Sequence, residues 1–249
     1  MLKLCYKFRF ISVPLLADYL ARDKSSVYEN LYVLEKQGYI AKRYDKTYKL
    51  RGRPASYCLI AKGIKFLKTQ PETKQLVNET VLRNMYKNRT ISEEHVDHCL
   101  QVLASYVALN SQTNKTFNIF SKSELATSSF FPRPLPDLYL SRKQLTANKQ
   151  SDYMLDVFDA TIPFFVYIKR LRAYQNHCDE AELDDGESYP YVLLIAPDDK
   201  TEQRLLKLIE GMLQDFDIYT TTLNRILAPP NNNSAIWKDV FADDEYIEL

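Results

Sequence analysis

Apolar residues recur at helical spacing in two short runs near the start of the chain, with a polar break at residues 22–24 between them. Ser12 precedes the first run and can cap a helix, and Gly38 follows the second run, where a helix commonly ends. The positions that share a helical face are Leu16 and Leu20 in the first run and Val27, Leu31 and Leu34 in the second. This spacing predicts two short helices joined by a tight turn, a helix-turn-helix.

Two patterns overlap in the first eleven residues. Every second residue from Leu2 to Phe10 is apolar, which is the periodicity of a strand, whereas Leu4, Phe8 and Ile11 fit one face of a helix. A compact helix-turn-helix core needs a third helix, and tertiary context often overrides local preference. We therefore predict a helix in this segment.

After Gly38 the spacing becomes that of strands. Three β-prone runs follow, at residues 39–41, 48–50 and 56–60, and charged turn residues separate the first two. We expect a β-hairpin that lies against a phosphate backbone, the wing of a winged helix. The cations that this hairpin would carry are Lys42, Arg43, Lys46, Lys49, Arg51 and Arg53.

The exposed face of the second helix is the expected DNA-reading surface. Opposite the buried stripe, a helical wheel places Ser25, Glu29, Tyr32 and Lys36, with Ser26 and Tyr28 on the flanks. We expect these side chains to meet base edges in the major groove, and Lys24 to meet a backbone phosphate. The alternative is a solvated face on a module that docks proteins, since winged helices serve both roles.

The second half of the chain mixes strand and helix patterns. Residues 71–87 are charged and predict a helical connector, after which Ser92 can cap a longer helix. Helical spacing returns later, with candidate caps at Thr161 and at Asp198 or Asp199. The β-prone runs are residues 116–120, 138–140, 153–158, 191–196 and 216–220, the later helices are residues 163–177 and 201–213, and an acidic loop is expected at 179–188.

Strands with helices between them predict a mixed α/β sheet, so we expect an α+β chain of three segments. Residues 1–70 would form a winged helix-turn-helix DNA-binding domain and residues 71–90 a helical connector. Residues 91–249 would form a mixed α/β domain.

Charge is distributed unevenly between these segments. Residues 1–70 hold fifteen Lys or Arg and five Asp or Glu, whereas residues 71–249 hold eighteen and twenty-seven, so the net charge of +1 is a cancellation. Clustered cations gain affinity by releasing the counterions condensed on phosphate. The first candidate partner of the basic segment is therefore nucleic acid.

Several other protein classes are disfavoured by composition. No run approaches the roughly twenty apolar residues of a membrane span, and Lys and Arg interrupt the first ten residues too often for a signal peptide. The four cysteines form no Cys-x-x-Cys pair, and the five glycines build no phosphate-cradling loop. We expect a cytoplasmic protein with no membrane partner and no cofactor.

The order of elements in the second domain, a helix, three strands, a helix and a strand, matches the core of PD-(D/E)XK nucleases. Such enzymes hold a divalent metal with an acid at one strand end and an acid-x-Lys on the next strand. Asp137 and Asp156 supply the acids here, but Phe158 occupies the lysine position. Lys169 or Arg170 on the following helix could reach in. We expect a site that no longer cuts DNA, with Asp137 and Asp156 vestigial or holding Mg²⁺ without catalysis.

A second candidate metal site is weaker. His95 and Cys99 are four residues apart on the expected long helix, a spacing that can chelate zinc, yet structural zinc sites normally need four ligands. The adjacent His177 and Cys178 are the remaining candidates. We therefore interpret His98 on the same helix as a packing or hydrogen-bonding residue of the nuclease-like core.

Across nearly its whole length the chain resembles the replication-relaxation family, and the order and spacing of its motifs carry the resemblance. These motifs are Leu31-x-x-Leu34-x-x-x-Gly38-Tyr39-Ile40, Tyr57-x-Leu59-x-x-x-Gly63, His98-x-Leu100-x-Val102, Pro136-Asp137, Leu155-Asp156-Val157 before Thr161, Arg170-Leu171-x-x-Tyr174, Thr221-Thr222-Leu223 and Ile236-Trp237. The resemblance implies a winged helix followed by a degenerate nuclease-like domain, and an association with plasmids and conjugative elements. Phe158 replaces an acid and Ala160 a glycine of the family pattern.

The leading hypothesis is a non-catalytic, sequence-specific protein that binds double-stranded DNA and assists plasmid replication or conjugative transfer. A relaxase or a replication initiator would dock on the α/β domain, or that domain would form a homodimer. The alternatives are a transcription repressor of a mobile element, a metal-dependent nuclease that uses Asp137 and Asp156, and a docking adaptor that never touches DNA.

Overall fold

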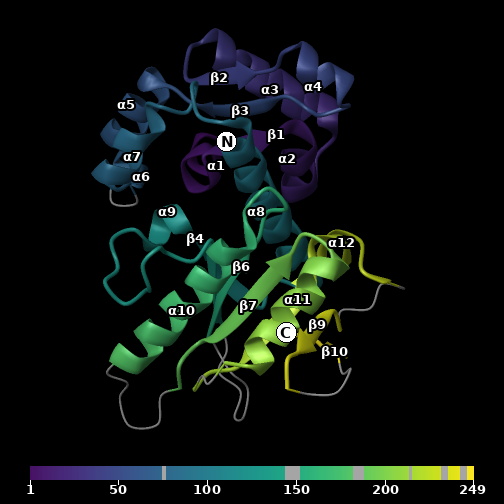
Figure 1. Cartoon of the computed structure of the whole chain (residues 1–249). Helices are drawn as coiled ribbons and strands as arrows, with labels where there is room; N and C mark the ends of the chain where they lie inside the picture. The colour runs from purple at the N-terminus through teal and green to yellow at the C-terminus, as the bar shows by residue number, and fades with distance from the viewer. Residues whose placement is uncertain (75–76, 144–151, 182–187, 213–214, 231–234, 242–245) are drawn as a thin grey trace. The chain divides into compact units, whose positions relative to one another are not determined.

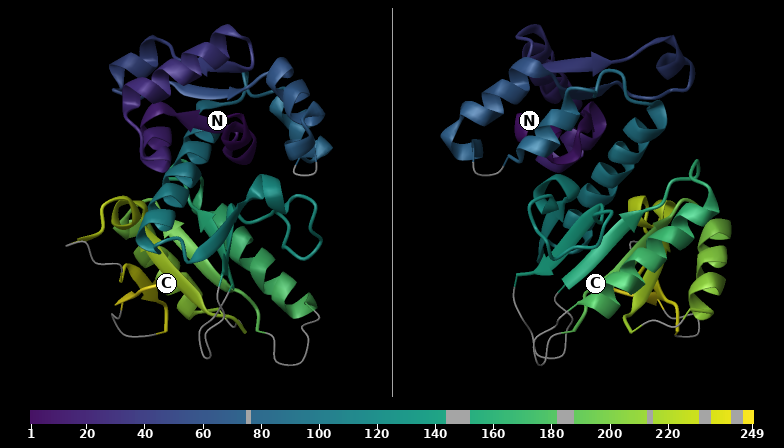
Figure 2. Two further views of the ribbon diagram at one scale, coloured as in Figure 1. Left: turned by 180° about the vertical axis from the view of Figure 1, so that it is seen from behind. Right: turned by 60° about the vertical axis from the view of Figure 1, so that its left-hand side comes forward.

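The computed structural model confirms a mixed α+β chain with helices and two sheets. It divides into two compact units (Figures 1 and 2). Unit 1 comprises Met1–Val107 and Ser121–Thr127, and unit 2 comprises Ala108–Phe120 and Ser128–Leu249. Unit 1 thus extends beyond the connector expected at residues 71–90. The structure describes residues 1–74, 77–143, 152–181, 188–212, 215–230, 235–241 and 246–249.

Unit 1 is built on a three-stranded antiparallel sheet in the order β1-β3-β2. The central strand β3 is buried at all four positions, which explains its apolar and small residues. The strands are β1 (Phe10–Ser12), β2 (Ile40–Arg43) and β3 (Ser56–Leu59), and the helices are α1 (Leu2–Phe8), α2 (Val13–Leu20), α3 (Lys24–Lys36), α4 (Lys46–Leu50), α5 (Ala61–Thr69), α6 (Pro71–Lys74), α7 (Glu79–Met85) and α9 (Lys122–Leu125). Helix α8 (Glu93–Gln112) belongs to unit 1 as far as Val107.

The overlap of helix and strand patterns at the N-terminus reflects two elements in succession. Helix α1 ends at Phe8, Arg9 takes a left-handed φ of 63°, and β1 begins at Phe10. The predicted helix is therefore confirmed as far as Phe8. The last two residues of the predicted segment, Phe10 and Ile11, lie in strand β1 instead, because Phe10 pairs with Cys58 of β3.

Helices α2 and α3 confirm the predicted pair. Ser12 stands at the N-cap of α2 but makes no side-chain capping hydrogen bond, whereas Asp23 caps α3 by accepting from the Ser26 N–H. Val27 and Leu31 on α3 are buried, as their spacing predicted. A polar turn of three residues joins the two helices.

Two glycines explain the path around the second strand. Gly38 follows α3 with a φ of +75°, a conformation that favours glycine. A Cβ on Gly63 would stand 2.2 Å from the Tyr39 carbonyl oxygen, so only glycine lets α5 approach the start of β2 this closely. The Gly-Tyr-Ile step and the later glycine of the sequence pattern thus belong to one packing contact.

The predicted strand at residues 48–50 is wrong. Residues Lys46–Leu50 form the short helix α4, and the hairpin consists of β2 and β3 with α4 in their connection. The Asp45 carboxylate caps this helix by accepting from the N–H groups of Thr47 at 2.8 Å and Tyr48 at 3.2 Å. Strand-like composition was overridden because Asp45 satisfies the free donors of a helical turn.

The connector and the long helix follow the prediction. Helix α6 covers Pro71–Lys74 and α7 covers Glu79–Met85, and α8 begins at Glu93 after Ser92, whose Oγ accepts from the His95 N–H at 3.4 Å. Within the described ranges, no helix has both the length and the apolar character needed to cross a membrane.

Unit 2 is a seven-stranded mixed sheet in the order β10-β9-β8-β7-β6-β5-β4. The neighbours β6, β7 and β8 are parallel, and β5 runs antiparallel to β6. Helices α10 and α11 connect these parallel strands and cover one face of the sheet (Figures 1 and 2). The elements are β4 (Phe117–Ser121), β5 (Leu138–Arg142), β6 (Asp152–Val157), α10 (Phe164–Glu180), β7 (Tyr191–Ala196), α11 (Asp199–Glu210), β8 (Ile218–Thr222), α12 (Leu223–Leu227), β9 (Trp237–Asp239) and β10 (Tyr246–Ile247).

The caps of unit 2 were predicted with mixed success. Asp198 caps α11 and accepts from the Thr201 N–H at 2.7 Å. The cap predicted at Thr161 is wrong, because Pro163 stands at the N-cap of α10 and the Thr161 N–H and hydroxyl donate to Asp159. Most of the acidic loop expected at 179–188 lies outside the described residues.

Candidate nucleic-acid interface

Helix α3 presents a polar and aromatic face to solvent. Its predicted DNA-reading residues lie opposite the buried Val27 and Leu31, and they are all exposed except Ser26, which is half-buried. Two of these exposed side chains are aromatic, Tyr28 at 45% and Tyr32 at 47% exposed. The structure therefore leaves this face of α3 accessible within unit 1.

Aromatic rings and lysines extend this face onto the β2–β3 connection. Tyr28 and Tyr32 stack with ring centroids 6.4 Å apart. Lys36 lies 5.3 Å from the Tyr32 centroid, and Lys42 lies 5.8 Å from that of Tyr28 and 5.3 Å from that of Tyr44. We call Tyr28, Tyr32, Lys36, Lys42 and Tyr44 the tyrosine–lysine surface. It joins α3 to the end of β2 in one continuous strip.

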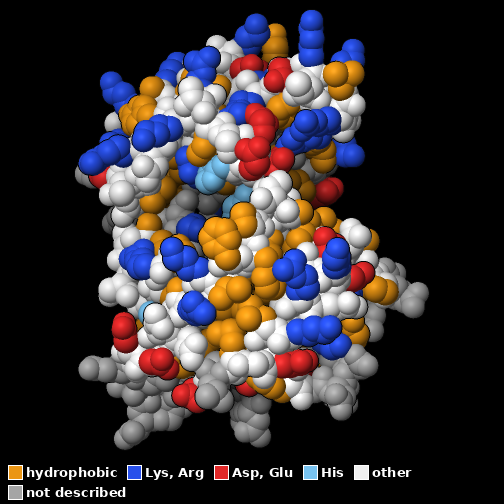
Figure 3. Space-filling model, in the orientation of Figure 1, with side chains coloured by type: hydrophobic (Ala, Val, Ile, Leu, Met, Phe, Trp, Pro, Cys, Tyr) orange, Lys and Arg blue, Asp and Glu red, His pale blue; other side chains and the backbone are white. Residues whose placement is uncertain are grey.

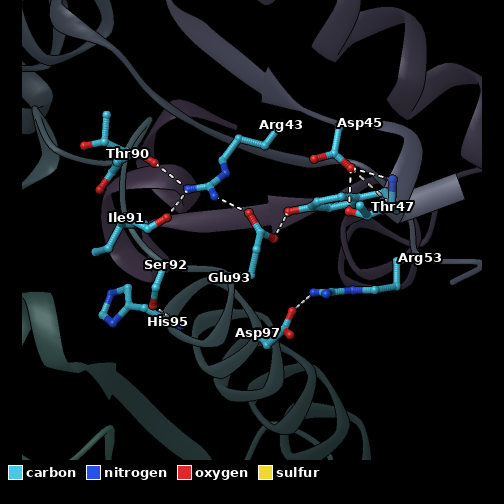
Figure 4. Close-up of polar contacts among 12 residues, drawn as sticks. Arg43, Asp45, Thr47, Arg53, Thr90, Ile91, Ser92, Glu93, His95 and Asp97 are labelled. Atoms are coloured by element: carbon cyan, nitrogen blue, oxygen red, sulfur yellow. Dashed lines mark hydrogen bonds and ion pairs between the residues drawn. The ribbon is translucent and has the colours of Figure 1, made fainter. Parts of the chain in front are cut away.

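Arg43 does not face this strip. Its guanidinium donates to the carbonyl oxygens of Asn88 and Ile91, both at 2.9 Å. It also forms an ion pair with Glu93 at the start of α8 (Figure 4). Its side chain is only 15% exposed. The predicted phosphate contact of Arg43 is therefore replaced by a structural role.

Arg53 is also held inside unit 1. It forms an ion pair with Asp97 on α8 (Figure 4). Its guanidinium also lies 5.0 Å from the ring centroid of Tyr48. The buried Tyr48 donates its hydroxyl proton to the Glu93 carboxylate. Arg43, Tyr48 and Arg53 thus anchor the β2–β3 connection to α8, and we call these three residues the anchor.

Burial and the Glu93 carboxylate change the acidity of the anchor tyrosine. The pKa of Tyr48 is raised above its ordinary value, first because burial disfavours the phenolate and second because Glu93 accepts its proton in a hydrogen bond. The tyrosine therefore stays protonated and keeps donating at neutral pH.

Six of the eight cations predicted to meet DNA remain exposed. None of the six forms an ion pair with any residue that the structure describes. Lys and Arg side chains project from the part of unit 1 that carries α3 and α4 (Figure 3). These cations are Lys24, Lys36, Lys42, Lys46, Lys49 and Arg51.

The two acids predicted as a vestigial metal site do come together in unit 2. Asp137 and Asp156 are 6% and 4% exposed. The Asp137 N–H donates to Asp156 Oδ1 at 3.2 Å, and the Val157 N–H donates to Asp137 Oδ2 at 3.1 Å. Both carboxylates therefore serve as acceptors at the adjoining ends of β5 and β6.

A guanidinium already pairs with one of these two acids. Arg170 on α10 forms a buried ion pair with Asp156 and also donates to the Pro134 carbonyl oxygen. Tyr174, one turn further along α10, donates to Asp156 Oδ2 at 2.9 Å. Burial alone would lower the pKa of Arg170, but Asp156, Tyr174 and Asp137 together raise it. Arg170 is thus held in its charged form.

The other residues weighed at this site lie elsewhere. Phe158 is buried and stacks on Tyr167 with ring centroids 4.2 Å apart, and Lys169 is exposed. Among the described residues, no group of three or more His, Cys, Asp or Glu side chains could hold a metal ion. Of the two cations predicted to reach this site, Lys169 and Arg170, it is Arg170 that lies beside Asp156.

The histidines and Cys99 have other contacts. His95 Nε2 lies 2.8 Å from Arg9 Nη1, and Cys99 packs with Phe10, Cys58 and Val96. His177 contacts the Tyr189 hydroxyl at 2.8 Å. The zinc spacing on α8 therefore corresponds to packing and hydrogen bonding within unit 1.

Comparisons with protein-family models, with curated proteins and with solved structures found no match to this chain.

Sequence reasoning missed the anchor and its partners Glu93 and Asp97. The capping residue Asp45 before Thr47 was a local signal for α4 that the strand-like composition concealed. No local signal pointed to the ion pairs, because Arg43 and Glu93 are fifty residues apart.

Proposed function

We propose that this chain is a non-catalytic protein that binds double-stranded DNA at specific sequences. Unit 1 would be a winged helix, with α3 as the recognition helix and the β2–β3 connection as the wing. The observation that carries the proposal is the tyrosine–lysine surface, which is exposed and lies beside exposed cations of the same unit.

The dimensions of α3 suit a major groove. Its thirteen residues span about 20 Å, and the major groove admits a single α-helix. Tyrosine hydroxyls and lysine ammonium groups can donate to acceptors on base edges, and Glu29 can accept from cytosine. The mixture of donors, an acceptor and rings supports sequence recognition rather than charge attraction alone.

The wing would contact the backbone through fewer residues than the sequence suggested. Lys46, Lys49 and Arg51 project from α4 and the residue after it, while Arg43 and Arg53 fix the position of the wing. Phosphate contacts set the register of a protein on the duplex. A wing anchored to α8 would hold its three cations in one place relative to α3.

For unit 2 we propose a nuclease-like domain that does not cut DNA. A nuclease of the PD-(D/E)XK type needs a divalent metal beside its acids, and the guanidinium of Arg170 already occupies the position next to Asp156. Phe158 supplies no lysine for orienting water. This domain would then form a homodimer or dock a relaxase or a replication initiator.

The cellular role rests on the sequence resemblance. Membership of the replication-relaxation family would place the protein in the cytoplasm, on DNA near an origin of a plasmid or conjugative element. A transcription repressor would share the DNA contact but would bind beside its own promoter. The location of the bound fragments distinguishes the two roles.

The test is selection of bound duplexes from fragments of the source DNA, followed by mobility shifts with the selected sequence. Tyr32→Ala and Lys36→Gln should each weaken binding, by about 10-fold for a lost base contact. The control is Lys65→Gln on α5, which removes an exposed lysine outside the proposed interface. Failure of the wild-type chain to shift any duplex would support a docking adaptor instead.

A further inference from the structure

Leu50 is the most exposed large apolar side chain among the described residues, at 86%. It is the last residue of α4, at the tip of the β2–β3 connection. A single exposed leucine is ordinary on a protein surface, so exposure alone carries no conclusion. The surroundings of Leu50 are what distinguish it.

Cations flank Leu50 on both sides. Lys49 precedes it, Arg51 follows it, and Lys46 lies one helical turn before it. All three are exposed. The acid nearest in sequence, Asp45, uses its carboxylate to cap α4. An apolar side chain therefore projects from a tip that carries three exposed cations and one exposed carboxylate, Asp45, so the tip has a net positive charge.

Backbone hydrogen bonds also fix the end of α4 at this tip. The Arg53 N–H donates to the Tyr48 carbonyl oxygen at 2.9 Å, and the Gly52 N–H donates to that of Lys49 at 3.2 Å, which closes the end of α4. Gly52 takes a φ of +63°, so the chain turns back directly after Leu50 and Arg51. Leu50 therefore lies on a hydrogen-bonded turn that the buried side chain of Tyr48 connects to the core of unit 1.

We propose that Leu50 enters the minor groove of the bound duplex as a wedge and kinks the DNA, while Lys46, Lys49 and Arg51 contact the phosphates beside the groove. Apolar wedges of this kind partly unstack a base step and bend the duplex toward the major groove. This inference rests on the proposed function of unit 1 and adds a second recognition element to it.

Charge complementarity selects DNA over other occupants of the tip. A polyanion matches three cations around one apolar side chain, because each cation can neutralise a phosphate while the leucine leaves water. The wedge also implies a sequence preference that needs no base hydrogen bond. Pyrimidine–purine steps unstack most easily, so a TA or CA step should lie beneath Leu50.

The experiment measures the bend angle of the selected duplex, from the transfer efficiency between dyes on its two ends, with the full-length chain bound. Wild type should bend the duplex, and Leu50→Ala should abolish most of the bend and weaken binding by about 5- to 10-fold. Leu50→Met should restore the bend, because methionine also serves as a wedge. Lys49→Gln is the matched control and should weaken binding while leaving the bend intact.

The outcomes separate the two proposals. If wild type and Leu50→Ala bind the duplex with the same bend, the wedge is overturned and the DNA-binding proposal stands. If wild type binds no duplex, both are overturned. If Leu50→Ala leaves the bend unchanged but abolishes binding to phosphatidylserine vesicles, the tip is a membrane contact and the wedge is likewise overturned. Unchanged thermal unfolding of Leu50→Ala establishes that the variant is folded.

Discussion

The guanidinium of Arg170 forms an ion pair with the carboxylate of Asp156, and both side chains are more than nine-tenths buried. Tyr174 and the Asp137 N–H complete the hydrogen bonding of that carboxylate. The pair of acids thus has a cation supplied by the chain itself. This arrangement makes the acids part of the core of unit 2, and it predicts what happens when the cation is removed.

Replacing Arg170 with methionine should destabilise unit 2 by about 3–5 kcal/mol, because Asp156 would remain buried without a partner. Denaturant unfolding of the full chain measures the change. Arg172→Met on the same helix removes an exposed arginine and should cost less than about 0.5 kcal/mol. Equal losses in the two variants would contradict the ion pair as a source of stability.

The wild-type chain should not cut DNA. Supercoiled plasmid incubated with Mg²⁺ or Mn²⁺ should yield no more nicked product with wild type than with Asp137→Ala, because the Arg170 guanidinium stands beside the acids and Phe158 supplies no lysine. Agarose gels resolve the nicked form. Nicking that needs the metal and disappears in Asp137→Ala would revive the nuclease hypothesis.

Glu93→Gln tests whether the anchor positions the β2–β3 connection, the proposed wing. The change removes the ionic partner of Arg43 and weakens the acceptor of Tyr48, at a cost of about 1–2 kcal/mol in unfolding free energy. Loss of a negative charge near DNA would by itself raise affinity. If the anchor holds the wing in place, affinity for the selected duplex should fall instead.

The control for the anchor is Asp18→Asn, which removes an exposed carboxylate of α2 in the same unit. Its affinity should stay constant or rise slightly. Fluorescence anisotropy at one fixed salt concentration compares the two variants with wild type. A rise in affinity in both variants would indicate that Glu93 acts only through its charge.

Salt dependence should count the phosphate contacts. Six exposed cations predict a slope near −5 in a plot of log affinity against log salt concentration. The double variant Lys46→Gln/Lys49→Gln should reduce the steepness by about 2. A slope that the double variant leaves unchanged would exclude α4 from the interface.

Stability should fall above pH 9 because two buried thiols must stay neutral. Burial raises the pKa of Cys5 from 9.0 to about 12 and that of Cys58 from 9.0 to about 11. The unfolded chain ionises these thiols near pH 9, so their contribution is complete below pH 9 and is lost as the pH rises toward 11 and 12.

Between pH 8 and pH 10 the unfolding free energy should drop by about 2–3 kcal/mol from the two thiols together. Urea unfolding at a series of pH values measures this slope. Cys58→Ala should lose about 1–1.5 kcal/mol less than wild type over the same range, because only the share of that thiol is removed. A profile that stays flat in wild type would show that neither thiol resists ionisation in the folded state.

Elements with local signals were predictable from sequence. The α2–α3 pair, the Ser92 start of α8 and the Asp198 cap of α11 all depend on residues within four positions of one another. Their apolar spacing also identified which faces are buried. The exposed face of α3 followed directly, because a helix that buries one stripe must present the opposite one.

Errors arose where local patterns competed. The run at residues 48–50 looks like a strand, yet Asp45 caps a helix there and Tyr48 points into the core. Thr161 looks like a cap for α10, yet its hydroxyl donates to Asp159 and the helix starts later. In both places a single carboxylate selected one of two similar local conformations.

The sequence by itself determined the α+β composition, the helix pair and the concentration of positive charge in the first seventy residues, because periodicity and composition are properties of neighbouring positions. Only the tertiary structure decided which cations are available. Arg43 and Arg53 meet Glu93 and Asp97, and Arg170 meets Asp156, through contacts between segments 14 to 50 residues apart. Whether a charge faces solvent or a partner depends on how the elements pack, which no local pattern encodes.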